Sequence, residues 1–208
     1  MEKEVNISVN GVSLPGTLAL PEKAWGIVLF AHGSGSSRFS PRNRFVAEVL
    51  QNAGIGTLLF DLLTPEEDQV YENRFDIDLI TERLVKATEW LARQEEAQGS
   101  PFGYFGASTG AAAALKAAAR LGERIKAVVS RGGRPDLAMA DLPQVQAPSL
   151  LIVGGLDYTV LDLNRQALEK LQAEKHLEII PGATHLFEEP GTLEQAADTA
   201  AAWFKEKL

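Results

Sequence analysis

Short apolar runs alternate with amphipathic segments along most of the chain, and this alternation restricts the possible folds more than any other feature of the sequence. The run Trp25–Ala31 is apolar throughout, as expected of a strand buried on both faces of a parallel sheet. Between such runs lie segments with helical spacing, of which Asp76–Arg93 is the clearest. The pattern predicts a mostly parallel, doubly wound α/β sheet with right-handed crossovers.

The remaining predicted elements follow from the same two patterns. Further strand-like runs are Thr57–Phe60, Phe102–Phe105, Lys126–Val129, Leu150–Val153 and Leu177–Ile180, and further helical segments are Asn43–Ala53, Thr109–Leu121, Leu163–Ala173 and Leu193–Lys207. Two alternating segments, Val5–Val9 and Leu14–Leu20, flank Asn10-Gly11, which is typical of a two-residue hairpin turn. We therefore expect an N-terminal antiparallel hairpin at one edge of the sheet. The 208 residues contain no repeat or linker, which predicts a single domain over residues 1–208.

Composition excludes several classes of protein. The chain has 20 Lys and Arg against 28 Asp and Glu, a net charge of −8, so nucleic acid is not an expected partner. It has no cysteine, which excludes a thiol nucleophile, and its three histidines are too scattered for a metal pair, so we expect no metal and no cofactor. No apolar run approaches the ~20 residues that span a bilayer. The charged N-terminal segment lacks a signal-peptide pattern, so we expect a cytoplasmic protein with no membrane partner.

Ser108 is the candidate nucleophile. In sheets of this kind ligands bind at the carboxyl ends of the strands. Ser108 follows the run Phe102–Phe105, within Gly106-Ala107-Ser108-Thr109-Gly110, and a helical segment begins directly afterwards. A G-x-S-x-G sequence between strand and helix is typical of a sharp turn that projects its serine above the sheet, with glycines where a Cβ atom would collide. The alternative is an ordinary tight strand-to-helix turn.

His185 and Asp157 are the candidate base and acid. His185 follows the last strand-like run, whereas His176 begins that run and should lie at the opposite edge of the sheet. Asp157 follows the run Leu150–Val153, where it could orient His185 and stabilise its charged form. The alternative for Asp157 is a helix N-cap, although Asp162 directly precedes a helical segment and is the better candidate for that role.

A loop of small residues, His32–Ser37, follows the first buried strand and could approach a ligand closely. We expect the backbone N–H groups of Ser34 and Thr109 to form an oxyanion hole, with Gly33 as the alternative to Ser34. His32 is expected to hold this loop in place.

With these motifs in this order, the chain resembles the α/β-hydrolase superfamily, particularly its dienelactone-hydrolase-like branch. The resemblance covers nearly the whole chain and implies that Ser108 is the nucleophile, His185 the general base and then acid, and Asp157 the orienting carboxylate. Dienelactone hydrolases proper use a cysteine nucleophile, and its absence here favours a serine esterase. The 17 residues 132–148 are too few for the cap domain of larger relatives.

These features predict a serine hydrolase that cleaves small carboxylic esters through an acyl-enzyme intermediate. Thioester or lactone hydrolysis is an alternative, and so is a non-catalytic small-molecule binder on the same fold. Arg38 and Arg131 could meet a substrate carboxylate or phosphate, unless they are solvated or pair with acidic residues. Phe39, Tyr158 and Phe187 could line an apolar substrate pocket, for which packing in the core is the alternative reading.

Overall fold

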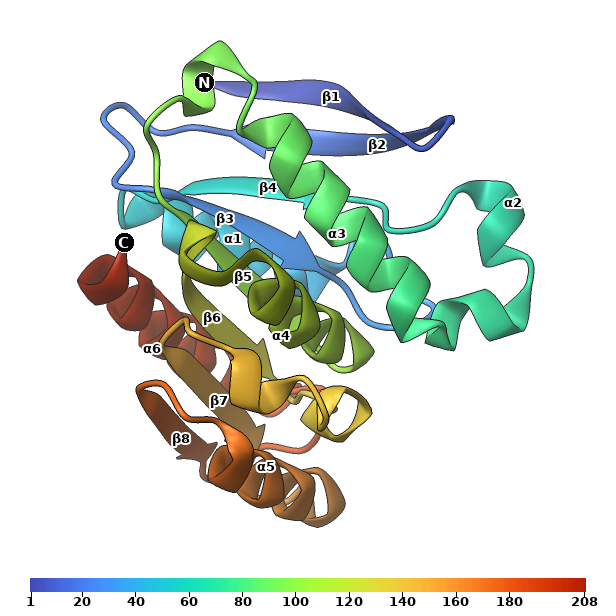
Figure 1. The fold of residues 1–208 in the computed structure, drawn as a ribbon. Coiled ribbons are helices and arrows are strands. Elements are labelled where there is room, and N and C mark those ends of the chain that lie inside the picture. Colours follow the sequence, from blue (N-terminus) through green and yellow to red (C-terminus); the bar gives the residue numbers. More distant parts are fainter.

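The computed structural model describes all 208 residues and contains one eight-stranded sheet (Figure 1). Strand β1 is antiparallel to β2, and β2 to β4, while all other neighbours are parallel. The predicted mostly parallel sheet with an N-terminal hairpin is therefore confirmed. The strands are β1 (Glu2–Val9), β2 (Val12–Ala19), β3 (Ile27–Ala31), β4 (Gly56–Phe60), β5 (Phe102–Ala107), β6 (Ile125–Arg131), β7 (Ser149–Gly154) and β8 (Lys175–Ile180), in the order β1-β2-β4-β3-β5-β6-β7-β8.

Helices cover both faces of the sheet. Helices α1 (Pro41–Asn52) and α6 (Thr192–Lys207) lie on one face, and α3 (Ile77–Leu91), α4 (Thr109–Leu121) and α5 (Tyr158–Lys170) lie on the other (Figure 1). Because side chains alternate along a strand, Val128 packs into the core beneath α3 and α4, whereas Val129 packs beneath α1 and α6. Apolar runs such as β5 and β6 are therefore buried on both sides.

Two helices begin earlier than the sequence pattern predicts. Helix α1 starts at Pro41 because Ser40 caps it, accepting a hydrogen bond from Asn43 N at 3.4 Å, and proline suits the first helical position. Helix α5 starts at Tyr158 rather than Leu163. Asp162 therefore lies inside the helix and pairs with Arg165, so the prediction that it caps the helix is wrong.

The connection between β6 and β7, above the carboxyl ends of the strands, is short. Between β6 and β7 there are only two 3₁₀ turns, η4 (Pro135–Ala138) and η5 (Leu142–Gln144), so no cap domain covers this edge. Between β4 and α3 the chain forms the single turn α2 (Pro65–Asp68) and the 3₁₀ helix η1 (Tyr71–Phe75), both missed by the sequence pattern. No helix is both long enough and apolar enough to cross a membrane.

Candidate active site

Ser108 lies on a strained turn between β5 and α4. Its backbone has φ 52° and ψ −122°, a conformation that is costly for a residue with a side chain. The flanking positions have no room for a side chain and therefore require glycine. A Cβ atom on Gly106 would lie 2.4 Å from Ala111 Cα, and one on Gly110 would lie 2.1 Å from Ala31 O. The Ser108 hydroxyl does not cap α4, so it is left free to face the end of the sheet.

His185 and Asp157 meet above the ends of β7 and β8. His185 Nδ1 lies 2.6 Å from Asp157 Oδ2, a short charge-assisted hydrogen bond. Asp157 occupies the cap position of α5, but its carboxylate makes no capping bond and is turned to the histidine instead. Gly154 allows this meeting, because a Cβ atom there would lie 2.4 Å from Ala183 O, in the loop that carries His185. The contact leaves Nε2 of the imidazole as the nitrogen available for proton transfer.

One cavity of about 250 Å³ joins the nucleophile turn to the histidine. Most of the residues that line it are polar, and they come from the loop after β3, the start of α1, the ends of β5 and β6, and the loop after β8. Ser108 and His185 share this cavity, although their side chains are not hydrogen-bonded to each other here. Such contacts often tighten only when a substrate binds. The lining residues are Gly33, Ser34, Ser36, Ser40, Arg42, Asn43, Ala107, Ser108, Arg131, His185 and Leu186.

The loop after β3 passes directly against the nucleophile. A Cβ atom on Gly33 would lie 3.2 Å from Ser108 Cβ. The next amide, Ser34 N, donates to Thr109 Oγ1 at 2.9 Å, so one predicted oxyanion donor is hydrogen-bonded to the side chain of the other. Thr109 is the first residue of α4, where backbone N–H groups lack intrahelical partners and the helix dipole favours negative charge.

His32 fixes this loop rather than facing the cavity of Ser108. Its Nδ1 donates to Gly33 O at 3.0 Å, and its Nε2 accepts from Leu62 N at 3.2 Å. Burial lowers the pKa of His32, which keeps the ring neutral and able to accept that hydrogen bond. The structure thus supports the expected loop-holding role.

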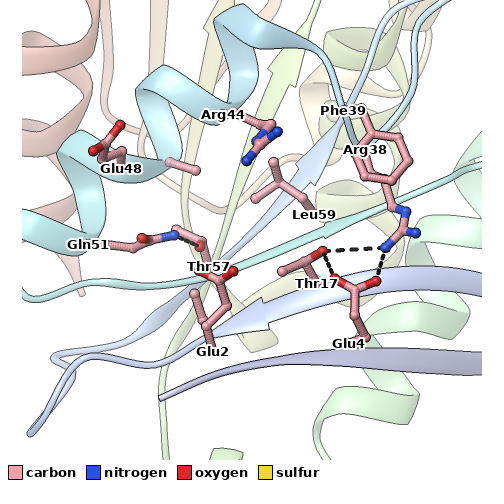
Figure 2. Close-up of a pocket in the computed structure, with 12 residues that line it drawn as sticks. Glu2, Glu4, Thr17, Arg38, Phe39, Arg44, Glu48, Gln51, Thr57 and Leu59 are labelled. Carbon is pink, nitrogen blue, oxygen red and sulfur yellow. Dashed lines mark hydrogen bonds and ion pairs between the residues drawn. The ribbon is translucent and has the colours of Figure 1, made fainter.

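Of the five residues predicted to bind substrate, the structure brings only Arg131 to this cavity. Arg38 and Phe39 line a separate cavity of about 350 Å³ between the hairpin and α1, where Glu4 and Thr17 hydrogen-bond Arg38 (Figure 2). Arg38 is turned there because Asp61, at the end of β4, accepts from its backbone N–H at 2.8 Å. Its guanidinium lies 4.3 Å from the centre of the Phe39 ring.

The other two predicted residues also lie outside the cavity lining. Phe187 is 2% exposed and packs in the core beneath α1 and α6, which is the alternative reading of that residue. Tyr158 is 67% exposed on the first turn of α5. Sequence reasoning missed the contribution of α1, whose Ser40, Arg42 and Asn43 line the cavity. The available signal was Ser40-Pro41, a typical helix start that would have placed these residues in a first turn.

The fold and this grouping of serine, histidine and aspartate define an α/β-hydrolase. Residues 16–207 match the model of the Dienelactone hydrolase family, so the chain belongs to that family. The crystal structure of a dienelactone hydrolase from Anabaena variabilis superposes with a TM-score of 0.97 at 58% identity, covering 100% of this chain and 98% of that one. The esterase domain of a Rhodothermus marinus protein has the same fold at 19% identity, with a TM-score of 0.80 over 99% of this chain and 98% of that one.

Two curated relatives from strains of Mycobacterium tuberculosis are longer than this chain. Each is 58% identical over 207 residues and is provisionally named a phosphoribosyl transferase. The match covers 100% of this chain but only 47% of each relative, so the chain spans about half of their length.

Proposed function

We propose that this protein is a serine hydrolase that cleaves small carboxylic esters through an acyl-enzyme intermediate. The observation that carries the proposal is the 2.6 Å contact between His185 Nδ1 and Asp157 Oδ2, in a histidine that shares a cavity with Ser108. A histidine oriented by a carboxylate beside a serine is the arrangement that acyl transfer requires.

In the first half of the reaction Ser108 Oγ attacks the ester carbonyl carbon and transfers its proton to His185 Nε2. Asp157 stabilises the imidazolium that forms. The carbonyl oxygen becomes an oxyanion at the N-terminus of α4. There the backbone N–H of Thr109 stabilises it, together with the backbone N–H of Ser34 or Gly33 in the loop after β3. When the carbon–oxygen bond of the ester breaks, His185 gives its proton to the departing alcohol, leaving the acyl group on Ser108.

In the second half a water molecule attacks the acyl-enzyme. His185 takes a proton from the water, the second tetrahedral intermediate forms in the same oxyanion hole, and its collapse returns the proton to Ser108 Oγ and releases the carboxylic acid. The reaction needs no metal or other cofactor. A cavity of about 250 Å³ without a cap domain favours a small substrate.

The transferase name of the mycobacterial relatives does not lead us to propose that activity for this chain. The match covers 47% of each relative, which leaves a segment of similar length to carry the named chemistry. Ser108, Asp157 and His185, which follow strands β5, β7 and β8, instead favour hydrolysis. A phosphoribosyl transfer activity that is lost in Ser108→Ala would contradict this division.

Ser108→Ala tests the proposal directly. We expect the variant to lose both ester turnover and covalent labelling by a fluorophosphonate, with the labelled peptide of the native protein mapping to Ser108. Ser130→Ala is the matched control, since Ser130 is the next-to-last residue of the neighbouring strand β6 and its buried hydroxyl has no hydrogen-bond partner. Unchanged activity in Ser108→Ala would refute the assignment. A panel of esters, thioesters and lactones ranks the substrate classes, and the absence of both labelling and turnover would favour a non-catalytic binder.

A further inference from the structure

Arg131 is a buried cation without an acidic partner. It ends β6 next to the nucleophile turn, pairs in register with Ala107, and accepts the Ser108 N–H on its backbone oxygen at 3.2 Å. The residue is 6% exposed, its Nε has no hydrogen-bond partner, and no carboxylate lies within ion-pairing distance of it. Buried charges are normally paired, so this exception requires an explanation.

The contacts that Arg131 does make are weak. Its Nη2 lies 3.4 Å from Asn43 Oδ1, at the limit of a hydrogen bond, and its guanidinium lies 5.5 Å from the centre of the Phe187 ring. Burial, and after it the positive charge of Arg42, lower the pKa of Arg131 to about 10, so the charged neighbour that acts on Arg131 is a second cation. Arg42 has one acidic contact, Glu188 Oε1 at 3.4 Å, and Glu188 is largely exposed. The buried positive charge of Arg131 therefore has no negative charge to compensate it, and the only acidic contact of Arg42 is at the surface.

The start of α1 adds further positive potential at the same place. Ser40, Arg42 and Asn43 line the cavity together with Arg131, and the first turn of α1 contains no acidic residue. A helix of 12 residues presents the positive end of its dipole there. Because the same cavity holds Ser108, a ligand attracted to this end would lie beside the nucleophile.

We propose that the cavity contains an anionic subsite, in which Arg131 and Arg42 hold a carboxylate or phosphate group of the ester substrate beside Ser108. This proposal rests on the proposed serine hydrolase function. Arginine suits the subsite because its planar guanidinium can donate two parallel hydrogen bonds to either oxyanion. The preferred substrate is thus a small ester that carries a negative charge, and neutral acyl esters are poor mimics of it.

Matched ester pairs test the charge requirement. Monomethyl succinate and methyl 3-phosphonopropanoate carry the anion on the acyl side, and methyl 4-methylpentanoate is their neutral counterpart. O-Acetylglycolate carries the anion on the alcohol side, with isobutyl acetate as its neutral counterpart. The readout is the ratio of kcat/KM for the charged ester to that for its neutral counterpart, because a general loss of activity cancels in this ratio. We expect the native protein to favour at least one charged ester.

Arginine variants then test which residues hold the anion. Arg131→Met should lower the ratio by about 10- to 100-fold, as expected for loss of hydrogen bonds to a charged group. Arg131→Lys should lower it less, because charge is kept while the planar fork is lost, and Arg42→Met should lower it a few-fold. Arg44→Met is the control, since Arg44 lies on the same helix but lines the cavity beside the hairpin. The ratio should not change in that variant.

The outcomes separate the subsite from the hydrolase assignment. If Ser108 is labelled and esters are cleaved but the ratio is unchanged in Arg131→Met, the subsite is refuted and the hydrolase stands. If no ester is cleaved, thermal unfolding in succinate or inorganic phosphate still tests the subsite. An increase in Tm with either anion that is absent in Arg131→Met supports it, and no Arg131-dependent increase refutes it. A response to phosphate alone or to succinate alone identifies the preferred oxyanion.

Discussion

Replacing Arg131 by methionine should make the free protein more stable, although the substitution removes a charged side chain from the candidate active site. Burial and the neighbouring Arg42 lower the pKa of Arg131 well below the ordinary value of an arginine, to about 10. Each pKa unit corresponds to ~1.4 kcal/mol, so the fold carries this charge at a cost of about 3 kcal/mol. Methionine fills a similar volume without the charge.

The predicted gain depends on pH in a definite direction. Because the pKa of Arg131 is lower in the folded than in the unfolded chain, folding disfavours the charged form. The cost is fully present below the folded pKa of about 10 and is relieved as the pH rises from there towards the pKa of arginine in the unfolded chain. At pH 7 the Arg131→Met variant therefore avoids the whole free-energy cost of burying the charge. It also loses the contact between the guanidinium and the Phe187 ring, worth ~0.5–2 kcal/mol. A net stabilisation of about 1–2 kcal/mol should raise Tm by about 2–8 °C for a chain of this length.

Thermal and denaturant unfolding of native protein and variant at pH 7, in a buffer without phosphate or carboxylate ions, measure the effect. Arg83→Met is the matched control, because Arg83 is also 6% exposed but pairs with Glu67 Oε1 at 2.5 Å. That substitution removes the partner of a carboxylate and should lower the stability by about 1–3 kcal/mol. If Arg131→Met lowers the Tm as Arg83→Met does, Arg131 is compensated in the free protein and the reasoning is wrong.

Three further predictions concern the remaining parts of the site. Asp157→Asn should leave the fold intact but reduce kcat by about 10³- to 10⁴-fold, measured on any ester that the native protein cleaves, because an amide cannot hold His185 in the required tautomer; a loss below tenfold would remove Asp157 from the mechanism. Gly110→Ala should prevent folding or lower the Tm strongly, since its Cβ would lie 2.1 Å from Ala31 O, and a Tm within 2 °C of the native value, about 1 kcal/mol, would contradict the close packing of α4. The pKa of His32 is lowered by burial, so the unfolded chain takes up a proton first and stability should fall as the pH drops below 6.5. His32→Gln should reduce this pH dependence in urea titrations between pH 7 and 5, and an unaltered slope would assign it to other groups.

Strand ends were the most informative positions in the sequence. The buried strands are recognisable as apolar runs, and in a parallel sheet their carboxyl ends lie at one edge, so Ser108, Asp157 and His185 could be expected to come together. The side-chain contact between His185 and Asp157 needs only this topology and a glycine at the end of β7.

The substrate-binding predictions were less successful because they depended on which way loops turn. The sequence places Arg38 in the loop after β3, but its direction depends on the pairing of β1 with β2 and of β2 with β4, which brings Glu4 and Asp61 within its reach. The strand-like run Lys126–Val129 stops before Arg131, so the sequence pattern places Arg131 outside the strand. Strand β6 continues for two more residues, and that extension buries the guanidinium. Neither outcome can be read from local composition.

The short connection between β6 and β7 also affects the timing of the reaction. An enzyme whose site closes under a moving segment must open again before the product leaves, and that opening often limits turnover. Here two 3₁₀ turns stand where larger relatives insert a cap, and the nucleophile is reached from bulk solvent. We therefore expect the rate of acylation or deacylation to limit turnover, and not the opening of a segment over the site. Water for deacylation can enter the cavity directly from solvent. We therefore expect selectivity to come from the charges that line the cavity, because no cap domain between β6 and β7 closes over the substrate.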